Sequence, residues 1–223
     1  MARNNQLNRS PVAVIGLGRF GKSLALELMS EDVEVLGIDS DAKVVQSLAG
    51  RLTHVVEADT TDEEAMRQLS VQEFERAVIG IGTDLESSIL SASVLLNCGV
   101  RDIWAKAVSE SHARILTQIG VHHVVRPEHD MGKRVAHLVR GRMLDYIEFD
   151  DGFAIVKTRP PRALHGLRLA ESIPRTKHGI TIVGVKRTGQ DFTHATPDTV
   201  VQAGDLIIVS GPQDQVERFS ELP

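Results

Sequence analysis

The strongest constraint on the fold is a series of six short runs rich in valine and isoleucine, separated by longer segments of helix length. Apolar runs of this kind are typical of buried parallel strands joined by helical crossovers. The runs occupy residues 12–16, 33–39, 54–59, 77–82, 102–107 and 122–127. Six such strands with five crossovers predict an α/β fold with a doubly wound parallel sheet, which forms one domain over residues 11–130.

The sequence pattern changes beyond residue 130. Residues 131–147 place apolar side chains at helical spacing, so we expect a connecting helix and a hinge within residues 131–149. Short alternating strands with glycine, proline and aspartate turns follow, and a short helix is expected at residues 214–219. These features predict a second, smaller α+β domain over residues 150–223.

Charge and composition argue against two classes of function. The chain has 25 lysines and arginines against 30 aspartates and glutamates, a net charge of −5, and no run of basic residues. Nucleic-acid binding needs a basic surface, so we do not expect it. No apolar stretch reaches the roughly 20 residues of a membrane-spanning helix. The single cysteine, Cys98, cannot form an internal disulfide and fits a reducing cytoplasm.

A glycine motif follows the first predicted strand. Gly16, Gly18 and Gly21 form G-x-G-x-x-G at the start of the next helix, an arrangement that brings phosphate groups to a helix N-terminus. Asp39 ends the second strand, where a carboxylate can accept hydrogen bonds from ribose hydroxyls. These residues predict a nucleotide site, and Asp39 disfavours NADP. The alternative is that the glycines only pack the helix against the strand.

Further candidates follow the third and fourth predicted strands. Asp59 and Thr60 come where the adenine edge of a nucleotide would lie in a sheet of the usual order. Asp59 could instead be the N-cap of the next helix. Gly82 ends the fourth strand and would let a ligand lie close to the backbone.

Two cations favour a ligand with a high phosphate charge. Arg19 lies inside the glycine loop, where its planar guanidinium suits a terminal phosphate, and Lys106 ends the fifth strand at the same sheet edge. A triphosphate carries up to about four negative charges and a dinucleotide pyrophosphate about two, so the pair favours ATP or ADP over NAD. Each cation could instead form a structural salt bridge or lie in solvent.

Acidic residues after the sixth strand suggest a cation site. Glu128 and Asp130 offer the hard oxygen ligands that Mg²⁺ or Ca²⁺ prefers, at an edge where phosphates could also lie. An acidic residue at a helix start can equally stabilise the helix dipole. His122, His123 and His129 have neither zinc-motif spacing nor cysteine partners, so we interpret them as surface or strand-end residues.

No catalytic motif accompanies the glycine loop. The only tyrosine, Tyr146, is not followed by lysine four positions later, as in short-chain dehydrogenases, and no G-x-S-x-G occurs. Cys98 lies in an apolar helical run that is typical of a core. The second domain is also too small for a typical dehydrogenase catalytic domain. We therefore expect a ligand-binding sensor and not an enzyme; an NAD-dependent oxidoreductase is the alternative.

The combination of GLGRFG at residues 16–21, Asp39, IWAKA at residues 103–107 and PEHDMG at residues 127–132 resembles the KtrA/TrkA family of RCK regulatory subunits in bacterial potassium uptake. The resemblance implies a Rossmann-like RCK domain that binds ATP or ADP. It also implies a homodimer that assembles into an octameric ring, on the cytoplasmic face of a membrane-embedded K⁺-translocating subunit of the KtrB or TrkH kind. An NAD(H)-binding sensor of the TrkA type is the alternative.

The resemblance also implies roles for single residues. Arg19 matches an arginine that reaches a terminal phosphate near the dimer interface, and Glu128 matches the acid of an intersubunit divalent cation. Asp59 stands where many relatives have asparagine. The complete set of predicted nucleotide-binding residues is Gly16, Gly18, Arg19, Phe20, Gly21, Asp39, Asp59, Thr60, Gly82 and Lys106.

The second predicted domain resembles the RCK_C fold, which in several relatives binds cyclic di-AMP between two subunits. Arg175, Thr181 and Ile182, with Pro197 in a later turn, match that binding region, so cyclic di-AMP is a second expected ligand. Thr181 stands where asparagine is common. The alternative is that this segment only forms a turn between two strands.

Overall fold

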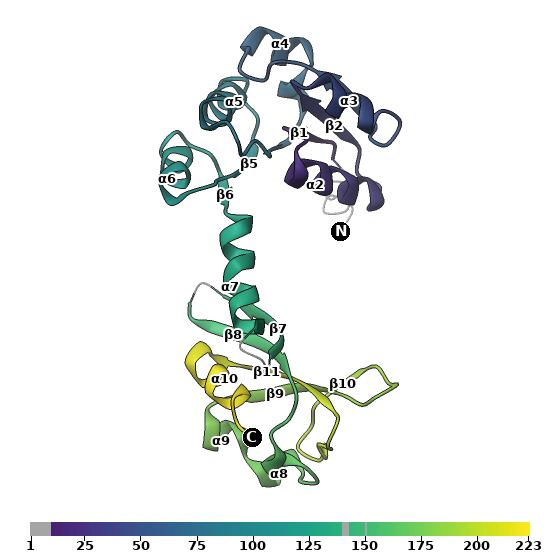
Figure 1. Cartoon of the computed structure of the whole chain (residues 1–223), viewed down its shortest axis with the longest axis vertical. Coiled ribbons are helices and arrows are strands. Elements are labelled where there is room, and N and C mark those ends of the chain that lie inside the picture. The colour runs from purple at the N-terminus through teal and green to yellow at the C-terminus, as the bar shows by residue number, and fades with distance from the viewer. Residues whose placement is uncertain (1–9, 140–142, 150) are drawn as a thin grey trace. The chain divides into compact units, whose positions relative to one another are not determined.

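Six parallel strands form the sheet of the N-terminal unit, in the order β3-β2-β1-β4-β5-β6. Figure 1 labels β1, β2, β5 and β6 of this sheet. The computed structural model describes residues 10–139, 143–149 and 151–223. β1 pairs with both β2 and β4, so the strand order reverses beside β1 and the predicted doubly wound sheet is confirmed. The strands are β1 (Val12–Ile15), β2 (Val35–Asp39), β3 (His54–Glu57), β4 (Arg76–Ile79), β5 (Asp102–Lys106) and β6 (His123–Val125).

Helices cover both faces of this sheet, because the side chains of β1 alternate between two cores. Val12 and Val14 share one core with residues of α2 and α3, whereas Ala13 and Ile15 share the other with residues of α4, α5 and α6. These helices are α2 (Arg19–Ser30), α3 (Ala42–Leu48), α4 (Glu63–Gln68), α5 (Leu85–Asn97) and α6 (Glu110–Gln118), with the 3-10 turn η1 (Val71–Glu73) after α4.

Five antiparallel strands form the sheet of the second unit, in the order β10-β9-β11-β8-β7. Its core joins Val156 and Ile207 of the sheet to Val216 and Phe219 of α10. The smaller α+β domain and its C-terminal helix are therefore confirmed. The elements are β7 (Met143–Glu148), β8 (Phe153–Thr158), η2 (Arg162–Leu164), α8 (Leu169–Ser172), α9 (Pro174–His178), β9 (Thr181–Lys186), β10 (Phe192–His194), β11 (Leu206–Pro212) and α10 (Gln213–Ser220).

Helix α7 (Pro127–Val139) follows β6, and the chain divides between Glu128 and His129 into two compact units. The helix predicted through residue 147 is wrong at its C-terminal end, because Met143–Glu148 form β7 and pair with β8. The apolar side chains there fit a helix or a strand, and pairing with β8 decides between the two. Across the described residues, no helix is both long and apolar enough to cross a membrane.

Candidate nucleotide-binding site

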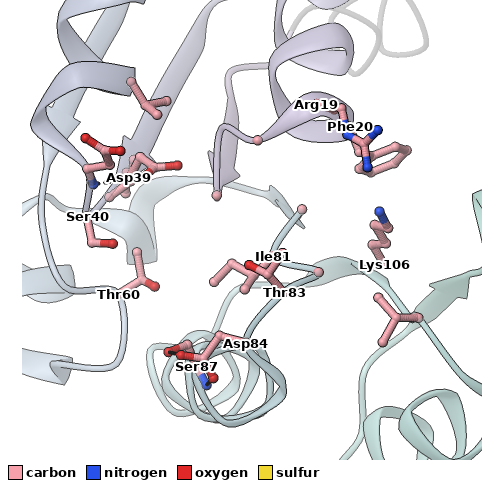
Figure 2. Close-up of a pocket in the computed structure, with 18 of the residues that line it drawn as sticks. Arg19, Phe20, Asp39, Ser40, Thr60, Ile81, Thr83, Asp84, Ser87 and Lys106 are labelled. Atoms are coloured by element: carbon pink, nitrogen blue, oxygen red, sulfur yellow. Dashed lines mark hydrogen bonds between the residues drawn. The ribbon is translucent and has the colours of Figure 1, made fainter.

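A cavity of 640 Å³ opens at the carboxyl edge of the parallel sheet, on the loops after β1 to β5. Its volume lies within the range of about 300–1,000 Å³ that is typical of small-molecule sites. Figure 2 shows Asp39, Ser40 and Thr60 on one side of it and Arg19, Phe20 and Lys106 on the other. The predicted residues that line the cavity are Gly16, Gly18, Arg19, Phe20, Asp39, Asp59, Thr60, Gly82, Lys106 and Glu128.

The three motif glycines have different structural roles. Gly16 has a φ of +80°, a conformation that residues with a side chain rarely adopt. A Cβ on Gly21 would collide with the carbonyl oxygen of Gly16, so Gly21 lets α2 pack against the loop and does not itself line the cavity. A Cβ on Gly18 would meet no atom within 4 Å. The space beside Gly18 is therefore open to a ligand, as the phosphate-loop prediction requires.

Helix α2 presents free backbone donors to the cavity. Its N-cap is Gly18, which has no side chain to accept a hydrogen bond, and its first turn contains no acidic residue. The first N–H groups of a helix lack partners within the helix and carry partial positive charge. Helices α3 to α6 differ, because each has an N-cap side chain that accepts a backbone N–H. The uncapped start of α2 is suited to an anionic ligand.

Asp39 fixes the glycine loop to the end of β2. Its Oδ2 accepts the N–H of Leu17 at 2.6 Å, and its Oδ1 accepts the N–H of Asp41 at 2.9 Å. Each carboxylate oxygen has a second lone pair for a further hydrogen bond. Lone pairs of Asp39 thus remain for a ligand while the carboxylate holds the glycine loop in place, and the contact with ribose stays a prediction.

Asp59 and Thr60 line the cavity after β3. Asp59 Oδ1 accepts the N–H and the hydroxyl of Thr61, at 2.9 and 2.7 Å, and these bonds hold the pKa of Asp59 below its usual value. The alternative that Asp59 is a helix N-cap is wrong, because Asp62 caps α4. The Thr60 hydroxyl is buried and lies 2.6 Å from that of Ser91. The backbone at this position is therefore tied to α5.

Lys106 and Glu128 form an ion pair at the Arg19 side of the cavity. The Lys106 ammonium lies 2.5 Å from Glu128 Oε1 and 5.8 Å from the centre of the Phe20 ring. The Lys106 side chain is 12% exposed and that of Glu128 is 66% exposed. The hydrogen bond from Lys106 lowers the pKa of Glu128. Lys106, which was predicted to bind phosphate, and Glu128, which was predicted to bind a divalent cation, therefore bind each other in this structure.

The charges of the cavity differ between its two ends. Arg19 lies at the start of α2 on the same side as Lys106, which is paired with Glu128. Asp39 ends β2, and Asp41 and Asp59 follow β2 and β3. Carboxylates accept hydrogen bonds from sugar hydroxyls, and cations with helix N–H groups bind phosphate. The arrangement is suited to a ligand with a sugar at one end and phosphate at the other.

Several lining residues were missed by the sequence interpretation. Asp84 follows β4 and caps α5, and its carboxylate accepts the N–H and the hydroxyl of Ser87 at 3.0 and 2.7 Å. These bonds lower the pKa of Asp84. The Gly-Thr-Asp run after the fourth strand is a capping signal that would have located it. The additional polar residues of the cavity are Ser40, Asp41, Thr83, Asp84 and Ser87.

A cation site was predicted at Glu128 and Asp130, after the sixth strand. Among residues 10–139, 143–149 and 151–223, no group of three or more histidine, cysteine, aspartate or glutamate side chains could hold a metal ion. Glu128 offers one carboxylate, so a Mg²⁺ or Ca²⁺ ion there would need further oxygen ligands from a bound phosphate or a second subunit.

The residues matched to cyclic di-AMP lie in the second unit, in α9, β9 and the segment after β10. Arg175 Nε donates to the Thr181 hydroxyl at 3.2 Å, and the Pro197 carbonyl accepts the N–H of Ala170 at 2.9 Å. Ile182 is buried in the core of this unit. Arg175 and Thr181 thus meet in the fold, while the side chain of Ile182 supports the core.

Cys98 lies at the end of α5, within the larger core of the N-terminal unit. Burial raises the pKa of its thiol, which disfavours the reactive thiolate. The interpretation of Cys98 as a core residue is confirmed.

Comparison with known proteins identifies similar sequences over nearly the whole chain. The family model of the TrkA-N domain matches residues 12–127, and that of the TrkA-C domain matches residues 153–223. Ktr system potassium uptake protein C of Bacillus subtilis (strain 168) is 36% identical over 210 residues, which cover 94% of this chain and 95% of that protein. Ktr system potassium uptake protein A of the same strain is 31% identical over 215 residues, covering 96% and 97%.

Solved structures share the fold at low identity. The crystal structure of the GsuK RCK domain superposes with a TM-score of 0.68 and 19% identity, over 96% of this chain and 48% of that one, so this chain spans about half of it. The GsuK channel bound to NAD gives a TM-score of 0.67 at 18% identity, over 96% and 40%. The structure of GsuK bound to ADP gives a TM-score of 0.50 at 16% identity, over 56% of this chain and 33% of that one.

Proposed function

The chain belongs to the family defined by the TrkA-N and TrkA-C domains, and on that premise we propose that it is a nucleotide-gated regulatory subunit of a potassium uptake system. Its similarity to two Ktr system potassium uptake proteins extends over nearly their full lengths. The single observation that carries the proposal is the cavity at the sheet edge, with the open Gly18, the uncapped α2 and the Asp39 carboxylate around it.

We propose ATP and ADP as the ligands of this cavity. Two cations and the start of α2 surround the phosphate end, and the carboxylate end suits ribose. NAD or NADH is the second candidate, since the fold is shared with a channel solved bound to NAD as well as with the same protein bound to ADP. In both cases the bound nucleotide biases a conformational equilibrium, and the chain catalyses no reaction of its own.

We propose that the chain works on the cytoplasmic side of a membrane, bound to a K⁺-translocating subunit. A regulator of this kind needs copies that act together, and exposed apolar residues on α7 and on α5 and α6 suit contacts between copies. On α7, Met131, Val135 and Val139 follow one another at four-residue spacing and are 53%, 44% and 78% exposed. On the adjacent helices α5 and α6, Leu90 and Ile115 are 44% and 39% exposed.

A closed ring of dimers requires two different interfaces. A two-fold interface pairs one face with itself, and a second, different face then joins the pairs. We propose that α7 forms the dimer and that α5 and α6 join dimers into an octameric ring. A hinge within residues 131–149 then lets each dimer respond to its nucleotide.

The first contact that nucleotide binding changes in this proposal is the ion pair between Lys106 and Glu128. Glu128 is the second residue of α7, and its partner Lys106 lines the phosphate end of the cavity. A bound phosphate competes with Glu128 for the ammonium, so nucleotide binding changes a contact of the first turn of α7. A released Glu128 can then bind Mg²⁺ or Ca²⁺ together with a second subunit. Cyclic di-AMP at Arg175, Thr181, Ile182 and Pro197 would act separately, in the second unit.

A binding experiment tests the ligand class. The full chain is titrated calorimetrically with ATP, ADP, NAD and NADH, each with and without Mg²⁺ and Ca²⁺. We expect saturable binding of ATP and ADP, and much weaker binding of both in Asp39→Asn. Arg218 pairs with Asp214 in α10 and does not line the cavity, so the control variant Arg218→Gln should bind ATP and ADP as the parent does. Tight NADH binding with negligible ATP binding would contradict the proposal in favour of an NAD sensor.

A further inference from the structure

A cluster of cations in the second unit lines a cavity that none of the roles above uses. The cavity has a volume of 450 Å³, within the range of about 300–1,000 Å³ for small-molecule sites. Three of its six lining residues are cationic and none is acidic. The lining residues are Arg159, Lys186, Arg187, Thr188, Gly204 and Leu206.

Strand pairing brings these cations together from separate parts of the chain. Lys186 at the end of β9 pairs with Leu206 of β11 and with Phe192 of β10. On the other side of β11, Ile207 pairs with Thr158, so Arg159 follows in the place beside Leu206. Thr158 and Ile207 are buried, and their neighbours alternate toward the opposite face. Arg159 and Lys186 therefore lie on the face of the sheet that the core does not cover.

The cavity is distinct from the segment matched to cyclic di-AMP. Thr181 begins β9 and Lys186 ends it, which separates the two by roughly 16 Å along an extended strand. Neither Arg175 nor Thr181 lines this cavity.

The three cations have no carboxylate partner among the described residues. The Lys186 ammonium lies 5.7 Å from the centre of the Phe192 ring, and Arg187 donates to the Val200 carbonyl at 3.4 Å. The nearby Asp205 is buried, and its carboxylate accepts the N–H of Gln202. Other arginines of this unit do pair with acids, at Arg134–Asp145, Arg168–Asp198 and Arg218–Asp214. Within the described ranges, these three cations thus form no ion pair, although the chain as a whole carries −5.

We propose that this cavity binds a phosphate-bearing anion. Like charges that are held close together repel one another, and an anion between them removes that repulsion. Two guanidinium groups suit the oxygens of a phosphate, and Lys186 adds a point charge. The phosphate can belong to a soluble compound or to a lipid headgroup. The second unit thereby senses an anion independently of the nucleotide site.

Calorimetry with inorganic pyrophosphate on the full chain tests the site, after ADP has saturated the nucleotide cavity. We expect one saturable site per chain, with affinity at least roughly tenfold lower in the double variant Arg159→Gln/Lys186→Gln. The double variant Arg168→Gln/Arg218→Gln removes the same charge from paired arginines and should bind as the parent does. If the double variant Arg159→Gln/Lys186→Gln is unstable, the single variant Arg187→Gln replaces it. Its melting temperature shows that it is folded, and its pyrophosphate affinity is compared with that of the parent.

Co-sedimentation with vesicles separates the two sources of phosphate. Binding to phosphatidylglycerol vesicles but not to phosphatidylcholine vesicles, lost in Arg159→Gln/Lys186→Gln alone, identifies a lipid headgroup. Pyrophosphate binding without vesicle binding identifies a soluble ligand. Binding of neither probe, or equal losses in the two double variants, overturns the proposal.

Discussion

The ammonium of Lys106 lies 2.5 Å from the carboxylate of Glu128, and this contact joins the nucleotide cavity to the first turn of α7. Lys106 ends β5 and is 12% exposed, so its position is fixed by the sheet. Glu128 is 66% exposed and is therefore the partner that is free to move. We expect a ligand phosphate that binds Lys106 to compete with Glu128, so that binding changes a contact of a helix rather than of a loop.

Replacing Glu128 by glutamine tests this competition. Glu128→Gln removes the charge that occupies Lys106 and keeps the size of the side chain. Because an ion pair with an exposed partner contributes about 0.2–1 kcal/mol, we expect ATP affinity without divalent cations to rise by up to about fivefold. Titration calorimetry measures the change. The effect of Mg²⁺ or Ca²⁺ on ATP affinity should disappear in the same variant, and an unchanged affinity would show that Glu128 does not compete.

Replacing Arg19 by alanine tests its role at the terminal phosphate. Arg19 is the first residue of α2 and lines the cavity on the same side as Lys106. A charge-assisted hydrogen bond contributes about 1.5–3 kcal/mol, so Arg19→Ala should weaken ATP binding by about tenfold or more. ADP lacks the terminal phosphate and should lose less. Equal losses for the two nucleotides, measured in parallel titrations, would remove Arg19 from that role.

Two alanine substitutions separate folding from binding within the glycine loop. Gly18→Ala adds a Cβ that meets no protein atom within 4 Å, so we expect a melting temperature close to that of the parent and a loss of nucleotide binding. Gly21→Ala adds a Cβ that collides with the Gly16 carbonyl oxygen, so we expect lower stability. Thermal unfolding and ATP titration of both variants check this. A strongly destabilised Gly18→Ala variant would contradict the assignment of that open space to a ligand.

Much of the fold could be predicted because its signals are local. Buried parallel strands require continuous apolar runs, and each run marks one strand without knowledge of its neighbours. The failure at Met143–Glu148 has the opposite cause. The apolar residues of this segment fit both the helical spacing and the alternation of a strand. Only pairing with β8, which comes later in the chain, selects the strand.

The cavity shows the same division between local and distant signals. Gly16, Gly18 and Asp39 were predicted because their spacing from the strands implies their chemistry. The engagement of Lys106 by Glu128 was not predicted, because it depends on how two separate strand ends meet at one edge of the sheet. The cation cluster at Lys186 was also missed, since strand register alone places Arg159 and Lys186 on either side of Leu206.

A charge on the apolar face of α7 should disrupt assembly. Val135 lies between Met131 and Val139 on that face and is 44% exposed, so Val135→Asp leaves the core of each unit intact. If a second copy covers the face, the buried aspartate has no partner and the dimer dissociates. Light scattering after size-exclusion chromatography measures the mass of the particle. Lys133→Gln, at an exposed position on the other side of the same helix, is the control, and an unchanged mass for Val135→Asp would exclude α7 from the interface.

The buried Tyr146 should make the stability of the second unit fall at alkaline pH. Its side chain is 3% exposed and its ring stacks on His137 of α7, and burial, with the nearby Glu148 and Glu217 carboxylates, raises its pKa to about 12. An unfolded tyrosine titrates near 10, so the folded state favours the neutral form. The resulting stabilisation is complete below about pH 10 and is lost as the pH rises through 12. Two pKa units correspond to at most about 2–3 kcal/mol.

Two measurements test this prediction. Since Tyr146 is the only tyrosine in the chain, tyrosinate absorbance reports its pKa directly. The variant Tyr146→Phe should show a smaller loss of unfolding free energy between about pH 9 and 12. A folded-state pKa near 10 would contradict the burial of this hydroxyl beside two carboxylates.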